Sequence, residues 1–221
     1  MVQLAIMVGG PYDRIPDIKQ ADSKEIIWIG VDRGSVRLLE QGIIPKIALG
    51  DFDSVTEEEL KEIKKEVGDV RVYKAEKDET DTELAVQIAF DEFDPNSVSI
   101  YGATGGRMDH LLNNIYMVFQ PKFFKQATKI RLIDKQNTIT YYKPGTHKLV
   151  KEVDKKYLAF TCLSPVERLS IMDAKYRLSH SDFTYPISLA SNEFVSDTVT
   201  FSFDSGLIAV IQSKDNETIG S

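Results

Sequence analysis

The first half of the chain alternates short, mainly apolar runs with longer segments whose apolar residues recur at helical spacing. Five runs share the first form: residues 4–8, 26–31, 47–49, 70–73 and 98–101. Runs of this length, followed by loops rich in glycine or polar residues, are typical of buried strands. Four segments share the second form: residues 34–41, residues 56–67, the stretch after residue 81, and residues 108–119. Strands that alternate with amphipathic helices predict an α/β domain with a doubly wound, mainly parallel sheet.

After Pro121 the pattern changes to short runs without helical segments between them. The strand-like runs are residues 129–134, 138–142, 148–153, 199–203 and 207–211. Pro144-Gly145 has the composition of a type II turn. Several short strands separated by turn signals predict an all-β sandwich. We place the boundary near Gln126, so that residues 1–126 form the α/β domain and residues 127–221 form the β-sandwich domain.

Composition limits which binding partners and which cellular compartment we expect for this protein. The chain has 221 residues and a net charge of −7, which argues against nucleic acid or an anionic membrane as the main partner. Cys162 is the only cysteine, so no intrachain disulfide forms, as suits a reducing compartment. The apolar run at residues 4–8 is too short for a signal peptide or a membrane span. We therefore expect a soluble, cytoplasmic protein.

Two carboxylates stand one residue apart in Gly50-Asp51-Phe52-Asp53-Ser54, just after the third apolar run. In an extended segment, side chains at positions i and i+2 point the same way, so we expect Asp51 and Asp53 to converge. Like charges in that arrangement favour a divalent cation with oxygen ligands, such as Mg²⁺. The alternative is a solvated acidic turn that only caps the next helix, where Thr56 and Glu59 have the spacing of a capping box.

Related motifs follow other apolar runs. Asp32 ends the second run, Lys77-Asp78-Glu79-Thr80-Asp81 follows the fourth, and Gly105-Gly106-Arg107-Met108-Asp109-His110 follows the fifth. Because ligands bind beyond the carboxyl ends of parallel strands, we expect these residues at one site. Carboxylates with Mg²⁺, balanced by Lys77 and Arg107, suit phosphoryl-type transfer. The alternative for Asp78 and Asp81 is that they only stabilise a helix dipole. Neither a Walker A motif nor a dinucleotide-binding G-x-G-x-x-G motif is present.

These three motifs, in this order and spacing, resemble the thiamine pyrophosphokinase family. Ser191-Asn192-Glu193 is similar to that family's thiamine-side motif, so the resemblance covers nearly the whole chain. It implies transfer of a diphosphate group from ATP to the hydroxyl of thiamine, with release of AMP and with Mg²⁺ as cofactor. It also implies that residues 1–126 bind ATP and Mg²⁺, that residues 127–221 bind thiamine, and that a homodimer carries its sites at the subunit interface.

The resemblance also implies roles for single residues. Four carboxylates would be catalytic, the first two as Mg²⁺ ligands: Asp51, Asp53, Asp78 and Asp81. Residues that would bind ATP or its phosphates are Asp32, Lys77, Gly105, Gly106, Arg107 and Asp109. Ser191 and Asn192 would contact thiamine. One departure stands out, because Val31-Asp32-Arg33-Gly34-Ser35 carries an arginine where the family usually has a glycine. Arg33 can instead supply an extra cation for phosphate.

Three alternative functions stay open at this point. A pyrophosphokinase for another alcohol, such as a hydroxymethylpterin, shares the chemistry of the first domain, although Ser191-Asn192-Glu193 favours thiamine. A Mg²⁺-dependent phosphohydrolase uses a similar acidic cluster and releases phosphate without thiamine. A non-catalytic protein binds nucleotide and turns nothing over. The general base and the number of metal ions do not follow from the sequence.

Overall fold

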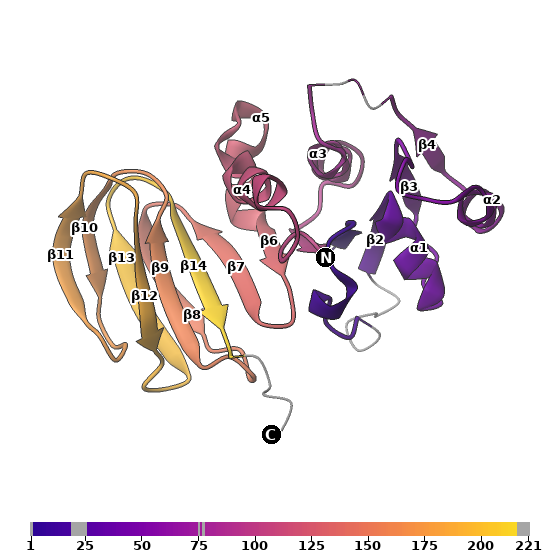
Figure 1. Cartoon of the computed structure of the whole chain (residues 1–221). Helices are drawn as coiled ribbons and strands as arrows, with labels where there is room; N and C mark the ends of the chain where they lie inside the picture. The colour runs from indigo at the N-terminus through magenta and orange to yellow at the C-terminus, as the bar shows by residue number, and fades with distance from the viewer. Residues whose placement is uncertain (1, 19–25, 75, 77, 216–221) are drawn as a thin grey trace. The chain divides into compact units, whose positions relative to one another are not determined.

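The structure is a computed structural model that describes residues 2–18, 26–74, 76 and 78–215 (Figure 1). The chain separates into two compact units, residues 1–135 and residues 136–221, and each is described by itself. No helix in the part of the chain that the structure describes is long and apolar enough to cross a membrane.

The first unit is built on a parallel sheet with strand order β6-β5-β1-β2-β3-β4. Its strands are β1 (Gln3–Met7), β2 (Ile26–Val31), β3 (Ile47–Gly50), β4 (Val70–Val72), β5 (Ser97–Tyr101) and β6 (Ile130–Ile133). The chain runs outward from β1 to β4 and then crosses to β5 on the other side of β1. The predicted doubly wound sheet is therefore confirmed, and its topological switch point lies between β1 and β5.

Helices pack on both faces of this sheet. They are α1 (Arg33–Glu40), α2 (Glu57–Glu66), α3 (Asp81–Phe93), α4 (Met108–Tyr116) and α5 (Pro121–Phe124), with short 3₁₀ turns η1 (Tyr12–Arg14), η2 (Met117–Phe119) and η3 (Ala127–Lys129). Figure 1 shows α1 and α2 on one side of β2 and β3, and α3 on the other. The capping box expected from Thr56 and Glu59 is confirmed at the start of α2, and Thr80 and Glu83 form another at the start of α3. They fix where these two helices begin.

Strand β6 differs from the sequence prediction. We assigned residues 129–134 to the sandwich, but Ile130–Ile133 pairs in parallel with β5, for example Val98 with Ile130. Ile130 and Leu132 are fully buried, because they extend the core of the parallel sheet. An apolar run of four residues fits either kind of sheet, so its sequence alone does not assign it.

The second unit is an antiparallel sandwich, as predicted. One sheet has the order β12-β9-β14-β7 and the other β11-β10-β13-β8. The strands are β7 (Asn137–Tyr142), β8 (Gly145–Val150), β9 (Tyr157–Cys162), β10 (Val166–Ile171), β11 (Leu178–Phe183), β12 (Ile187–Glu193), β13 (Thr198–Phe203) and β14 (Ile208–Ser213). Alternate residues face inward, and Phe160 and Phe201 meet at a ring-centroid distance of 5.0 Å. Cys162 lies in this core, where burial raises the pKa of its thiol to about 11.

Candidate active site

A cavity of about 930 Å³ lies in the first unit, at the carboxyl ends of the parallel strands. Its wall is formed by the loops that follow β1, β2, β3, β4 and β5. Predicted site residues in this wall are Asp32, Asp53, Asp78, Asp81, Gly106 and Arg107. Asp51 and Gly105 belong to the same loops and Asp109 lies in the first turn of α4, but these three are not part of the described wall. Lys77 lies outside the described residues, and Ser191 and Asn192 lie in the second unit.

The floor of the cavity is backbone at the switch point. The Gly10 N–H donates a hydrogen bond of 2.9 Å to the Gly102 carbonyl, and a Cβ on Gly10 would lie 2.0 Å from that oxygen. Gly102 has φ 74°, and a Cβ there would lie 2.6 Å from the Val8 carbonyl. The glycines therefore let the loops after β1 and β5 pack directly on each other. This packing, rather than a ligand, explains why glycine is required at these two positions.

Asp32 is half-buried in the cavity wall at the end of β2. Its Oδ1 accepts a hydrogen bond of 3.0 Å from the Phe52 N–H. A Cβ on Gly50, where φ is 142°, would lie 1.8 Å from the same oxygen, so only glycine fits beside this carboxyl. Burial raises the pKa of Asp32 to about 6, and the charges of Asp81, Asp51 and Asp53 add to the rise. Partial burial, with a smaller contribution from the neighbouring carboxylates, thus makes the ionised form of Asp32 less favourable than that of an exposed aspartate.

The segment 51–54 does not have the predicted geometry. We expected it to be extended, but Phe52 has φ 59° and its ring is buried against Ala48 and Ile63. Asp51 Oδ1 accepts a hydrogen bond of 3.0 Å from the Asp53 N–H, which closes a local turn. The cause is the burial of Phe52, which an extended segment would not place in this core. Asp53 alone of the two aspartates lines the cavity.

The acidic segment at residues 78–81, which leads into α3, is held by contacts with Glu83, α4 and α5. The buried carboxylate of Glu83 accepts hydrogen bonds from the Thr80 N–H (3.1 Å), from Asn113 Nδ2 (3.1 Å) and from Gln120 Nε2. Lys122 pairs with Glu79 at 2.6 Å. These contacts tie the segment to α4 and α5, so Asp78 and Asp81 are presented from a fixed backbone. A second cavity of about 520 Å³ shares Asp78 with the first.

Hard oxygen donors predominate among the titratable groups of the main cavity, which fits Mg²⁺. The described residues contain no group of three His, Cys, Asp or Glu side chains close enough to hold a metal ion together. Magnesium usually takes one or two carboxylates and completes its shell with water and substrate phosphates, so this donor set is sufficient. Burial, and then repulsion from Asp81, Asp51 and Asp53, raise the pKa of Asp32, and a bound cation would offset that repulsion.

Three arginines line the cavity. Arg33 is bonded to Glu59 and to the Ser54 carbonyl. Arg37 is half-buried and donates from Nη1 to the Val8 carbonyl at 3.2 Å; burial, and then repulsion from Arg33, hold its pKa below the ordinary value. Arg107 is exposed and pairs with Asp109 through contacts of 3.2 and 2.6 Å. Sequence analysis missed Arg37, although its place one helical turn after Arg33 puts both on one face of α1.

In the second unit, the Ser191-Asn192 segment sits at an irregularity in the pairing of β12 with β9. The Asn192 side chain is buried and is held by the backbone of Tyr176: Oδ1 accepts from its N–H at 2.9 Å, and Nδ2 donates to its carbonyl at 2.8 Å. Ser191 has φ 61° and an exposed side chain. Contact of both residues with thiamine stays a prediction, and Ser191 has the accessible side chain.

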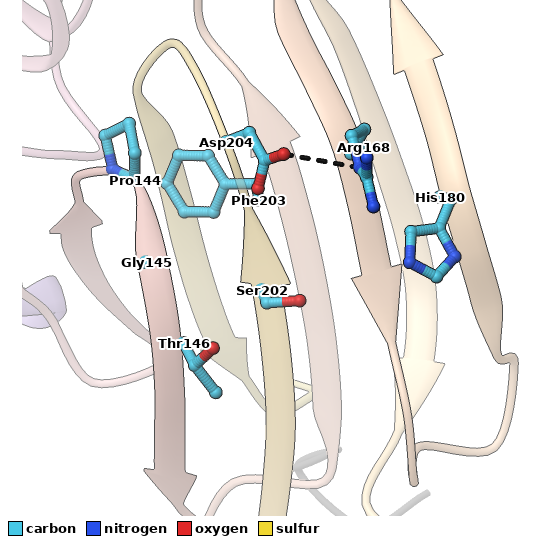
Figure 2. A pocket seen from close by; sticks show the side chains of 8 residues that line it. All are labelled: Pro144, Gly145, Thr146, Arg168, His180, Ser202, Phe203 and Asp204. Atoms are coloured by element: carbon cyan, nitrogen blue, oxygen red, sulfur yellow. Dashed lines mark ion pairs between the residues drawn. The ribbon is translucent and has the colours of Figure 1, made fainter.

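Another cavity, of about 430 Å³, lies on the outer face of the sheet β11-β10-β13-β8 (Figure 2). Figure 2 shows Arg168 and His180 on neighbouring strands, followed across the sheet by Ser202 and then Thr146. The Arg168 guanidinium pairs with Asp204 at 3.3 Å, so charge is balanced within the cavity. This arrangement lacks the clustered carboxylates that mark the cavity of the first unit.

Comparison with known proteins places both units in one family. The protein-family model "Thiamin pyrophosphokinase, catalytic domain" matches residues 18–132, and the family model "Thiamin pyrophosphokinase, vitamin B1 binding domain" matches residues 146–208. The chain is 42% identical over 217 residues to thiamine pyrophosphokinase of Bacillus subtilis (strain 168), a match that covers 97% of this chain and 100% of that protein.

Solved structures agree with this assignment. A thiamin pyrophosphokinase family protein from Enterococcus faecalis is 45% identical, with a TM-score of 0.93 over 97% of this chain and 100% of that one. Thiamin pyrophosphokinase from Geobacillus thermodenitrificans is 33% identical, with a TM-score of 0.84 over 98% of this chain and 99% of that one. The chain therefore belongs to the thiamin pyrophosphokinase family.

Proposed function

We propose that this protein transfers a diphosphate group from ATP to the hydroxyl of thiamine, giving thiamine diphosphate and AMP. The observation that carries the proposal is the cavity at the switch point, lined by Asp32, Asp53, Asp78 and Asp81, in a chain of this family. Polyphosphate and a cationic thiazolium are both compatible with such a site, because Mg²⁺ offsets the first and the carboxylates attract the second.

In this reaction the thiamine hydroxyl oxygen attacks the β-phosphorus of ATP. A new oxygen–phosphorus bond forms as the bond from that phosphorus to the bridging α-oxygen breaks, and AMP leaves with that oxygen. The hydroxyl proton passes to one of the cavity carboxylates, a role for which Asp32, Asp78 and Asp81 are candidates by position. The protein supplies mainly positioning and charge balance, as in other phosphoryl transfers.

Asp53, with Asp51 behind it in the same turn, is the proposed holder of Mg²⁺. The bound ion would supply positive charge to the phosphates. Arg37 and Arg107 are the proposed partners of phosphate oxygens, Arg107 after exchanging Asp109 for the ligand. The N-cap residue of α4 is Arg107, whose side chain makes no capping hydrogen bond, so the positive end of this helix dipole would also favour an anion bound beside Arg107.

We also propose a homodimer in which each site takes Ser191 and Asn192 from the partner subunit. Support comes from α4, where Met108, Leu112 and Tyr116 recur every fourth residue and are 67%, 49% and 45% exposed. An exposed apolar stripe of this kind is typical of an interface. Because α4 begins directly after Arg107, a partner on this stripe would lie next to the cavity.

The cytoplasm is the proposed compartment, since its reducing conditions suit a chain whose one cysteine is buried.

A substrate panel tests the proposed function against its alternatives. Purified protein is incubated with ATP and Mg²⁺, together with thiamine, with a hydroxymethylpterin, or with no alcohol. The proposal predicts AMP formation only with thiamine. AMP formation with the pterin alone would identify a different pyrophosphokinase, phosphate release without any alcohol would identify a phosphohydrolase, and tight ATP binding without turnover would identify a nucleotide-binding protein.

A further inference from the structure

Arg33 is the first residue of α1 and follows Asp32 directly. Its guanidinium makes two contacts of 2.5 Å: Nη1 donates to Glu59 Oε1, and Nη2 donates to the Ser54 carbonyl. Both partners lie in the connection from β3 to α2 or in the first turn of α2. The guanidinium is therefore engaged with the protein itself, although the sequence suggested a free cation for phosphate. Arg33 thus joins the loop after β2 to the loop after β3.

Glu59 is fixed from a second direction. Its other oxygen, Oε2, accepts a hydrogen bond of 2.8 Å from the Thr56 N–H as part of the capping box. The Thr56 N–H, and then Arg33, hold the pKa of Glu59 below its ordinary value. One carboxylate thereby links the start of α2 to Arg33, so a shift of the loop at residues 51–54 would disturb both contacts.

Asp32 and Arg33 hold the two residues on either side of Asp53. Asp32 accepts from the Phe52 N–H, and Arg33 donates to the Ser54 carbonyl. We infer that Arg33 is a positioning residue that keeps Asp53 in the cavity wall through its bonds to Ser54 and Glu59. This inference rests on the proposed function for the role of Asp53, but the loop contacts themselves do not.

Electrostatics explains why this loop needs an anchor. Asp51 and Asp53 both repel the carboxylate of Asp32, so an unrestrained loop would relax away from the cavity. Two charge-assisted hydrogen bonds from Arg33 oppose that movement. Arg37, one helical turn further along α1, instead donates to the Val8 carbonyl, directly after β1. The two arginines therefore differ in role: Arg33 holds the loop at residues 51–54, whereas Arg37 is available to phosphate.

Amide hydrogen exchange on metal-free, nucleotide-free protein tests the positioning role directly. In Arg33→Ala we expect amides of residues 52–56 to exchange roughly tenfold faster, since charge-assisted hydrogen bonds are lost. Arg71→Ala is the matched control, because Arg71 also pairs with a glutamate, Glu92, but outside the cavity wall. It should leave exchange at residues 52–56 unchanged. Unchanged exchange in Arg33→Ala would overturn the inference, whatever the activity.

Kinetics then separate positioning from phosphate binding. With Asp53 displaced, the Mg²⁺ concentration for half-maximal rate should rise about tenfold in Arg33→Ala, while kcat at saturating Mg²⁺ falls only a few-fold. Arg33→Lys should recover part of this loss, and Glu59→Gln should raise the Mg²⁺ requirement in the same direction. The double variant Arg33→Ala/Glu59→Gln should be no worse than Arg33→Ala.

A different set of kinetic results would identify Arg33 as a phosphate ligand instead. A raised KM for ATP at unchanged Mg²⁺ requirement, a silent Glu59→Gln, or additive effects in the double variant would contradict the positioning role. Should Arg33→Ala fail to fold, Glu59→Gln carries the test, because Gln keeps an acceptor oxygen for the Thr56 N–H. If the wild-type protein makes no thiamine diphosphate, the proposed function fails and the exchange experiment still decides whether Arg33 holds the loop.

Discussion

Replacing Asp32 by Asn removes one carboxyl from the acidic cavity and keeps its size and one acceptor oxygen. The Phe52 N–H can still donate to the amide oxygen, and the close packing on Gly50 remains. The change therefore isolates the electrostatic cost of Asp32. In the metal-free protein we expect Asp32→Asn to be more stable than the wild type at neutral pH, although a cavity residue has been lost.

The magnitude follows from the pKa of Asp32, which rises from 3.8 to about 6 on folding. Because this pKa is higher in the folded than in the unfolded protein, Asp32 contributes to the unfolding free energy in full below pH 3.8, and this contribution is lost as the pH rises through about 6. A rise of that size corresponds to about 3 kcal/mol of unfolding free energy at most. Solvent screening on the exposed side of the carboxyl reduces this to roughly 1–2 kcal/mol.

Urea denaturation in EDTA, at several pH values between 4 and 8, measures this difference. The unfolding free energies of wild type and Asp32→Asn should differ little at pH 4, and the variant should gain about 1–2 kcal/mol by pH 8. Glu62→Gln on the exposed face of α2 is the control, and its difference from wild type should not change with pH in this way. A constant difference, or a variant that is less stable at pH 8, would refute the electrostatic reasoning.

Two further predictions test the cavity floor and the dimer. Gly10→Ala should lower the unfolding free energy by about 2 kcal/mol or more in urea denaturation, because its Cβ would lie 2.0 Å from the Gly102 carbonyl. Gly68→Ala, whose Cβ would meet nothing within 4 Å, should stay within about 0.5 kcal/mol, and equal effects would contradict the packing argument. Asp53→Asn and Ser191→Arg chains, each inactive alone, should recover roughly a quarter of wild-type activity when refolded together, because half of the dimers are mixed and half of their sites carry no lesion. Mixed dimers without activity would show that each site is built within one chain.

The sequence predicted the features that depend on local pattern. The five strands that lead to the cavity are short, mainly apolar runs, and the starts of α2 and α3 next to it carry capping boxes. Because parallel strands end at one edge of the sheet, the loops that follow them had to meet. This reasoning predicted a shared site for Asp32, Asp53 and Asp81, and the three line one cavity in the structure.

Features that depend on contacts distant in sequence were not predictable. The turn at Asp51 arises because Phe52 packs into a core shared with α2, and no local pattern reveals that choice. The side chain of Asn192 is committed to Tyr176, sixteen residues earlier in the chain, and the bond depends on how the strands pair. The sequence predicts that Arg33 is a cation available to phosphate, whereas in the structure its guanidinium is bonded to Glu59 and to the Ser54 carbonyl. In each case tertiary packing decides which polar groups remain available to a ligand.

The most direct test of the central claim is product identification by ³¹P NMR with wild type and Asp53→Asn, each given ATP, Mg²⁺ and thiamine. We expect the wild type to form thiamine diphosphate and AMP in equal amounts. Asp53→Asn, with an unchanged circular dichroism spectrum, should lose on the order of hundreds-fold or more in rate. Formation of ADP and thiamine monophosphate would show attack at the terminal phosphorus, and near-normal turnover of Asp53→Asn at limiting Mg²⁺ would rule out a metal role for Asp53; either result would contradict the account.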